Sequence, residues 1–215
     1  MKPRWKLRPF LIAELLLAAL AGCLRPTEPV VYHTLQAQAA RSERPPPGQG
    51  LAVEVMPVGL PDMLRRPQIV TALGPGSLEL SRGHRWGNPL QQEIQRVVVE
   101  DLSRALGSDR IVAFPYGVRV NATFRVEVDV LHCEGRPGGT LTFLATWMIT
   151  RPGAEMAVVL GRTACEEPVP GTDAGSLVAA HSQALARLSQ EIAIRLRDPP
   201  PAHRPVQALP APIRP

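Results

Sequence analysis

The chain has few of the residues and none of the short motifs on which most catalytic and nucleic-acid-binding proteins depend. Only 4% of its 215 residues are aromatic, too few for the stacking surface that single-stranded nucleic acid requires. No Gly-x-Ser-x-Gly, Walker-type or Gly-x-Gly-x-x-Gly sequence follows a predicted strand. The Cys-x-x-Cys and His-x-x-x-His spacings of metal sites are absent as well. The sequence therefore predicts no catalytic residue, no metal and no enzymatic activity.

The apolar run at the N-terminus, from Phe10 to Leu20, is too short to cross a membrane. A transmembrane helix needs roughly 20 predominantly apolar residues. Four cations lie within the first eight residues, and small residues end the run. A charged segment, an apolar run and a small-residue cleavage site make up a secretory signal, so residues 1–22 are predicted to be a signal peptide.

The end of this run, Leu20-Ala21-Gly22-Cys23, resembles the lipobox of bacterial lipoproteins. The resemblance implies that Cys23 is diacylated, that the chain is cut before it, and that the new amine is acylated. Two or more acyl chains anchor a protein stably where one would be marginal. We therefore expect a covalent diacylglyceryl and N-acyl lipid on Cys23 and no other cofactor. The alternative is a soluble secreted protein in which a cysteine happens to follow the cut.

Lysine is absent from the predicted mature chain. The formal charge of +5 includes both lysines, two arginines and one glutamate of the signal peptide, which leaves 20 arginines against 18 acidic residues. This near balance argues against nucleic acid as a partner, because such proteins carry a strongly basic surface.

Cysteine is scarce, and only Cys133 and Cys165 remain once Cys23 carries lipid. An even pair in an exported, oxidising compartment is able to form one disulfide. A simple meander would instead place their strands about 9.6 Å apart, beyond the Cα separation of about 7 Å that a bridge tolerates. The sequence leaves open whether the two are bonded.

The mature chain is expected to consist of three segments. They are a tether at 23–29, a globular domain at 30–197, and a disordered, Pro-rich tail at 198–215. The tail holds seven prolines in 18 residues and little material for a core.

The pattern of apolar residues within the domain predicts an α+β two-layer sandwich, a mixed and mainly antiparallel sheet covered by two long helices. A polar loop is expected at Gln36–Gly50. Helices are expected from Pro89 to a stop at Gly107 and from Thr172 or Asp173 to about Arg197. Strands are expected at Val30–Leu35, Leu51–Val55, Gln68–Leu73 and Ser77–Leu80, and in a meander over Thr123–Leu131, Leu141–Ile149 and Met156–Cys165.

The segment from Pro61 to Pro67 is the most unusual part of the domain. Two prolines fix φ on either side of a short charged turn, and methionine and arginine are enriched at protein interfaces. The turn is therefore a candidate partner-binding surface, formed by Met63, Leu64, Arg65 and Arg66. The alternative is a rigid surface loop whose Leu64 fills the core.

Other groups with reactive side chains give weaker hypotheses. Glu127 and Asp129 point to one face of a strand at a separation that a glycosidase pair could have, but a solvated strand face explains them better. In His132-Cys133-Glu134, successive side chains alternate between faces and cannot converge on a metal. His181, on the apolar face of the second helix, is more simply a core histidine.

The chain resembles the PqiC (YmbA) family of lipoproteins, which are auxiliary components of ABC-type transport systems with MCE-domain proteins. The Arg-Pro-Gln-Ile-Val sequence is the most specific piece of the resemblance. The matching residues are the lipobox with Cys23, Tyr32-His33-Thr34-Leu35, Leu60-Pro61 through Arg66-Pro67-Gln68-Ile69-Val70, Trp86 with Leu90, and Ala180 to Ser189.

The resemblance implies a non-catalytic protein on the periplasmic face of the outer membrane. It would dock on an MCE-domain membrane protein that conducts lipids between the two membranes, and, because MCE proteins form rings, it would suit a homo-oligomer. Leu24, in place of the Asp linked to inner-membrane retention in enteric bacteria, favours the outer membrane. The alternative is a lipid-binding or envelope-assembly lipoprotein with its own ligand cavity.

Overall fold

The computed structural model describes residues 29–41, 51–115, 120–153 and 159–199, and the account below concerns these residues. Residues 1–30 and 31–215 form separate units. Every described helix and strand belongs to the second unit, whereas the predicted signal peptide and Cys23 lie outside the described residues.

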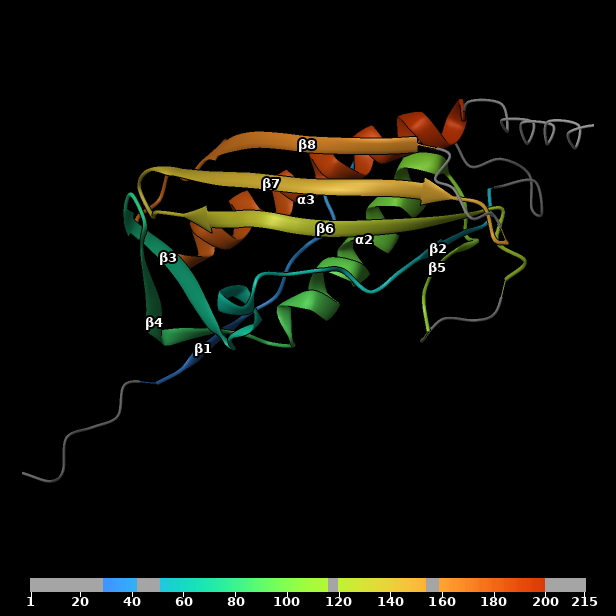
Figure 1. The fold of residues 1–215 in the computed structure, drawn as a ribbon. Coiled ribbons are helices and arrows are strands. Elements are labelled where there is room, and N and C mark those ends of the chain that lie inside the picture. The colour runs from blue at the N-terminus through green and yellow to red at the C-terminus, as the bar shows by residue number, and fades with distance from the viewer. Residues whose placement is uncertain (1–28, 42–50, 116–119, 154–158, 200–215) are drawn as a thin grey trace, which may run out of the picture. The chain divides into compact units, whose positions relative to one another are not determined.

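Eight strands form one sheet, and two α-helices and a 3₁₀ helix accompany them (Figure 1). The strands are β1 (Val31–His33), β2 (Val53–Val55), β3 (Gln68–Gly74), β4 (Ser77–Trp86), β5 (Ile111–Ala113), β6 (Phe124–Gly135), β7 (Thr140–Thr150) and β8 (Val159–Pro168). The helices are η1 (Asp62–Arg65), α2 (Leu90–Leu106) and α3 (Ala174–Arg197).

Strand β6 holds the two parts of the sheet together. One of its edges pairs antiparallel with β7, and β8 follows as the next antiparallel strand. Its other edge is shared: β2 pairs in parallel at the start, with Val53 opposite Phe124, and β3 meets the end, with Thr71 opposite Gly135. Strand β5 extends the sheet beyond β2, and β4 and then β1 extend it beyond β3. The predicted meander and the mixed, α+β class are confirmed.

The two long helices lie on one side of the sheet (Figure 1), and their ends follow from local chemistry. Gly107 ends α2 at a φ of 64°, a left-handed conformation that glycine adopts without strain. The side chain of Asp173 accepts a hydrogen bond from the Ser176 amide and caps α3. The sequence predicted both helices. It did not predict β5, it ended β4 six residues early, and it placed the end of β8 three residues early.

Alternation along the strands divides the sheet into a covered face and an open face. The side chains of β7 that face the helices are all buried: Leu141, Phe143, Ala145, Trp147 and Ile149. The other side chains of β7, which alternate with these, are exposed or half-buried and include four threonines. Fully burying one large apolar side chain contributes about 1.5–3 kcal/mol, so the covered face accounts for much of the stability.

The predicted loop at Gln36–Gly50 has no helix or strand in its described part, residues 36–41, and most of these residues are exposed, but Ala39 is buried and the segment is tied to the helices. Residues 34–40, which we call the strap, run on from β1 along α2 and reach α3, and they bury Leu35 and Ala39. Polar side chains of the helices bond the strap backbone. These bonds join Leu35 N to Glu93 (3.1 Å), Leu35 O to Arg96 (2.6 Å), Gln36 N to Ser182 (3.1 Å), Ala37 O to Arg104 (2.7 Å) and Ala39 N to Asp101 (2.7 Å).

The two cysteines of the domain are free thiols in the structure. Cys133 on β6 and Cys165 on β8 are each opposite Phe143 of β7, so a whole strand separates them. The three strands thus form the simple meander whose strand spacing is too large for a disulfide. The structure therefore argues against a bond between Cys133 and Cys165. Burial raises the pKa of Cys165 to about 11 and also raises the pKa of Cys133, so both thiols stay protonated and unreactive.

Candidate docking surface

The turn between the two prolines is a rigid projection. Asp62–Arg65 forms η1, whose Leu64 amide donates to the Pro61 carbonyl at 3.0 Å. Leu64 is only 2% exposed and belongs to the core. Of the four candidate residues, Leu64 therefore fills the core, as the alternative interpretation had it, and is not available to a partner.

The other three candidates lie at the surface, where Met63 is 43% exposed and Arg65 and Arg66 are exposed. Arg65 donates from Nε to the Leu60 carbonyl at 3.1 Å and lies 3.7 Å from the exposed Asp62 carboxylate. This bond holds Arg65 against the turn and leaves Arg66 as the less constrained cation. The structure brings one apolar side chain and two guanidinium groups together on the turn.

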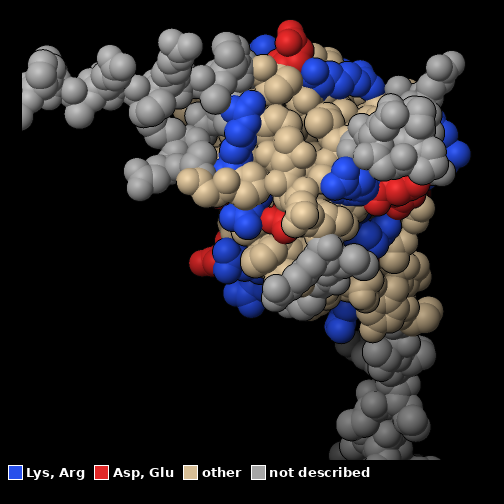
Figure 2. All heavy atoms as spheres, turned by 90° about the vertical axis from the view of Figure 1, so that its right-hand side faces the viewer, with Lys and Arg blue, Asp and Glu red and all other residues tan. Residues whose placement is uncertain are grey.

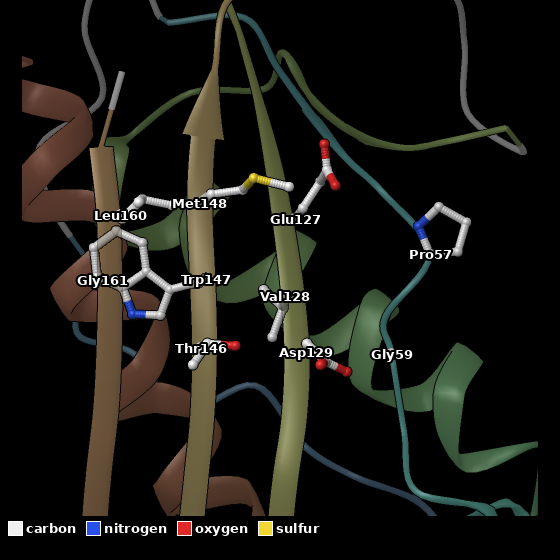
Figure 3. Close-up of a pocket in the computed structure, with 10 residues that line it drawn as sticks. All are labelled: Pro57, Gly59, Glu127, Val128, Asp129, Thr146, Trp147, Met148, Leu160 and Gly161. Carbon is white, nitrogen blue, oxygen red and sulfur yellow. The ribbon is translucent and has the colours of Figure 1, made fainter. Parts of the chain in front are cut away.

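An open hollow of about 500 Å³ lies on the open face of the sheet beside the segment that leads into this turn. In Figure 3 its residues form rows across neighbouring strands, with Leu160, Met148 and Glu127 in one row. The hollow is lined by Pro57, Gly59, Glu127, Val128, Asp129, Thr146, Trp147, Met148, Leu160 and Gly161.

Glu127 and Asp129 lie on the solvated face of β6, as expected, with Asp129 exposed and Glu127 half-buried, and both line the open hollow, which the sequence did not predict. Asp129 lies so close to Gly59 that a Cβ at that position would come 2.1 Å from its Oδ1. No residue lining the hollow is a histidine, cysteine, lysine or arginine that could orient or activate the carboxylates. The hollow therefore offers a shallow contact surface, and its lining gives no support to a glycosidase mechanism.

The histidine on the second long helix is a core residue, as expected. His181 is 3% exposed, its Nδ1 lies 2.8 Å from the Leu177 carbonyl, and its ring meets Trp86 edge-on. Burial lowers the pKa of His181, which keeps the ring neutral. His132 and Glu134 lie 3.6 Å apart on the sheet. In the part of the chain that is described, no three His, Cys, Asp or Glu side chains are placed to hold a metal ion.

Charge is mixed at the end of the domain that faces the viewer in Figure 2. Arginines are spread around this surface with acidic side chains among them, and uncharged surface separates them. On this face the cations form no continuous basic track. Among the described helices, none combines the length and the apolar character that a membrane span requires.

A family model for the ABC-type transport auxiliary lipoprotein component matches residues 33–193. The chain belongs to this family. Its members are lipoproteins and transport auxiliary components, as the resemblance in the sequence implied. The match covers every described element from the end of β1 almost to the end of α3, and both the strap and the turn lie within it.

Two solved structures share the fold. One, of an uncharacterized protein, is 20% identical over 79% of this chain and 99% of its own, with a TM-score of 0.64. The other, protein XCC0632 from Xanthomonas campestris, is 18% identical over 78% of this chain and 95% of its own, with a TM-score of 0.62. Among curated proteins, no match was found.

Proposed function

We propose that this auxiliary lipoprotein is anchored through Cys23 in the outer membrane, faces the periplasm, and acts as a non-catalytic adaptor of an MCE-type lipid transport system. The observation that carries the proposal is membership of a transport-auxiliary lipoprotein family in a chain that has its own lipobox. The partner is the MCE-domain protein of the ABC-type system, and several copies of the chain would suit its ring.

The Pro61–Pro67 turn is the proposed docking element. Its prolines and the Arg65–Leu60 bond limit its motion before binding, which lowers the entropy lost when a partner is bound. Arg65 and Arg66 offer planar donors to acidic groups, and exposed Met63 supplies the apolar contact.

The anchor is tested first. Replacing Cys23→Ala should move the protein out of the membrane fraction or leave it unprocessed, since no sulfur is left to acylate. The fully acylated mature chain has no lysine and no free α-amine, so an amine-reactive reagent should add no mass to it. An unchanged membrane yield for the variant, or an amine adduct on the mature chain, would contradict the anchor.

Docking is tested by capture of the purified MCE-domain protein on the immobilised, lipidated chain. Replacing Arg65→Ala and Arg66→Ala together should weaken capture by about 1–3 kcal/mol, a common cost for truncating an interface hot spot. The matched control is Arg162→Ala with Arg195→Ala, which removes two exposed arginines elsewhere. Equal affinity for both double variants would remove the turn from the interface, and a loss of folding in the first would assign its arginines to stability.

The alternative, a lipoprotein that holds its own lipid, would be favoured by a deep apolar cavity. The hollow on the sheet is open to solvent and carries two carboxylates, which makes it a poor acyl-chain site. Lipid that co-purifies with the chain in stoichiometric amount would favour this alternative.

A further inference from the structure

Exposed apolar side chains occur on three neighbouring strands of the sheet, with Leu78 and Leu80 on one face of β4 and Val31 and Tyr32 beside the other end of that strand. Ten large apolar side chains are exposed in the described residues, and half of them lie on β1, β4 and β3. They are Val31 (45%), Tyr32 (63%), Leu73 (59%), Leu78 (40%) and Leu80 (37%). Figure 1 shows β1 and the β3–β4 hairpin at the same end, away from the arrowhead of β7. We call this set the hairpin end.

The hairpin end is also where the chain arrives from the predicted lipid. Eight residues lead from Cys23 to Val31, and an extended chain spans at most about 3.5 Å per residue, so Val31 lies within about 28 Å of the acylated cysteine. Strand β1 pairs directly with β4, Val31 opposite His84 and Tyr32 opposite Arg85. The length of the tether therefore limits how far β1, which pairs with residues 84–86 of β4, can lie from the predicted anchor.

The charges of the hairpin suit a phospholipid surface. Strands β3 and β4 contain one acidic residue, Glu79, and two arginines; Glu79 and Arg82 are exposed, whereas Arg85 is half-buried, so Arg82 is the arginine available to a lipid phosphate. A guanidinium pairs readily with a phosphate through two parallel hydrogen bonds. Tyrosine is enriched at membrane interfaces because its ring is apolar and its hydroxyl is polar, and Tyr32 is the most exposed side chain of the set.

We propose that the hairpin end rests on the lipid headgroups of the membrane that holds the anchor, with Leu78 and Leu80 in the interface and Arg82 on lipid phosphates. This proposal rests on the anchor at Cys23. It adds a second attachment that fixes the orientation of the domain. The turn at Pro61–Pro67 is a separate element and remains the proposed contact with the protein partner.

The test uses the lipidated chain in vesicles of phosphatidylethanolamine and phosphatidylglycerol. In a Cys165→Ser background, an environment-sensitive fluorophore is placed through Leu78→Cys or, as the matched control, Leu160→Cys. Leu160 is 77% exposed and lies where β8 begins, beside the arrowhead end of β7. Emission from position 78 should shift to the blue and be quenched by headgroup-labelled nitroxide lipid, whereas emission from position 160 should stay as in buffer.

A second measurement removes the anchor and leaves the surface. The full mature chain with Cys23→Ser should bind the same vesicles weakly and more weakly still at high salt, which screens the arginines. Replacing Leu78→Ser and Leu80→Ser together should lower this binding by roughly tenfold, because apolar area in the interface drives it. The control, Leu160→Ser, should leave it unchanged.

The outcomes separate the two proposals. Wild-type chain absent from the membrane would refute the anchor itself. An anchored chain with water-like emission at position 78 would overturn the headgroup contact alone. If position 78 became shielded only when the MCE-domain protein was added, the hairpin end would be a protein contact, and the headgroup proposal would be wrong.

Discussion

The strap and the Pro61–Pro67 turn are both irregular segments, yet they differ in what satisfies their backbones. The strap is held by side chains more than 50 residues away in the sequence, from α2 and α3. The turn is held largely by local bonds, from the Leu64 amide to the Pro61 carbonyl and from the Arg65 side chain to the Leu60 carbonyl, together with the buried Leu64 and one bond from the Trp86 amide to the Pro67 carbonyl. The backbone of the strap is bonded by distant side chains, whereas the polar bonds within the turn are mostly local and its tie to the fold is the buried Leu64 and the Trp86–Pro67 bond.

This difference indicates which of the two segments is able to bind a partner protein. A buried backbone bonded by charged groups is costly to disturb, because each broken bond leaves a buried polar group without a partner. The exposed side chains of the turn, in contrast, can replace contacts with water by contacts with a partner protein while the core stays unchanged. Substitutions in the strap should therefore affect stability, and substitutions in the turn should affect binding.

The largest expected effect is in the strap. Leu35 is fully buried, so Leu35→Ala should lower the free energy of unfolding by about 2–5 kcal/mol through lost burial and the cavity left behind. Denaturant titration of the mature chain measures it. The matched control is Met63→Ala on the turn, which is 43% exposed and should cost well under half as much. An equal loss of unfolding free energy in both variants would contradict the distinction between a strap that stabilises the fold and a turn that does not.

The next effect concerns the charge that holds the strap. Burial alone would raise the pKa of Glu93, but hydrogen bonds from Arg96 and Asn88 outweigh burial and lower it. Glu93→Gln should cost about 1–3 kcal/mol near pH 7, the usual range for a bond to a charged group. Glu100→Gln is the control, since Glu100 pairs with Arg96 and Arg104 at the surface and should cost less than about 1 kcal/mol.

The pH dependence gives a sharper form of this test. Because the pKa of Glu93 is lower in the folded state, its contribution is complete above the unfolded value of 4.5 and is lost as the pH falls through the folded value. The difference between parent and Glu93→Gln should therefore shrink toward zero in acid. Asp101 acts in the opposite direction, since burial raises its pKa, and comparing parent with variant at each pH cancels its contribution. A difference that stays constant with pH would contradict this assignment.

The smallest effect on stability belongs to the turn. Arg65→Ala with Arg66→Ala, the variant proposed above for partner capture, removes only surface groups and should change the free energy of unfolding by less than about 1 kcal/mol. Thermal unfolding of the parent and the variant measures this. A larger loss would place the Arg65–Leu60 bond among the contacts that maintain the fold.

The sequence was informative wherever the signal was local. Proline at both ends marked the turn, Gly107 marked the end of α2, and strict alternation marked β6 and β7. The strap was missed because its alternating polar residues resemble a solvated loop, and its partners on α2 and α3 are visible only after folding. Strand β5 was missed for a similar reason: three residues carry little periodicity, and their pairing with β2 is entirely long-range. Leu64 illustrates the limit within the turn, because sequence alone left its two interpretations equal until burial decided between them.

The position of β6 has a consequence for how the chain acquires its fold. Strands β2 and β3 precede β6 by some 50 to 70 residues, yet both need it as a neighbour. Until β6 is available, the first half of the domain has no strand to join its two parts. Pairing at such long sequence separation is slow, which favours a first half that stays open until β6 is available. The adjacent meander supplies β6 with local partners, whereas β2 and β3 reach it only across the long separation.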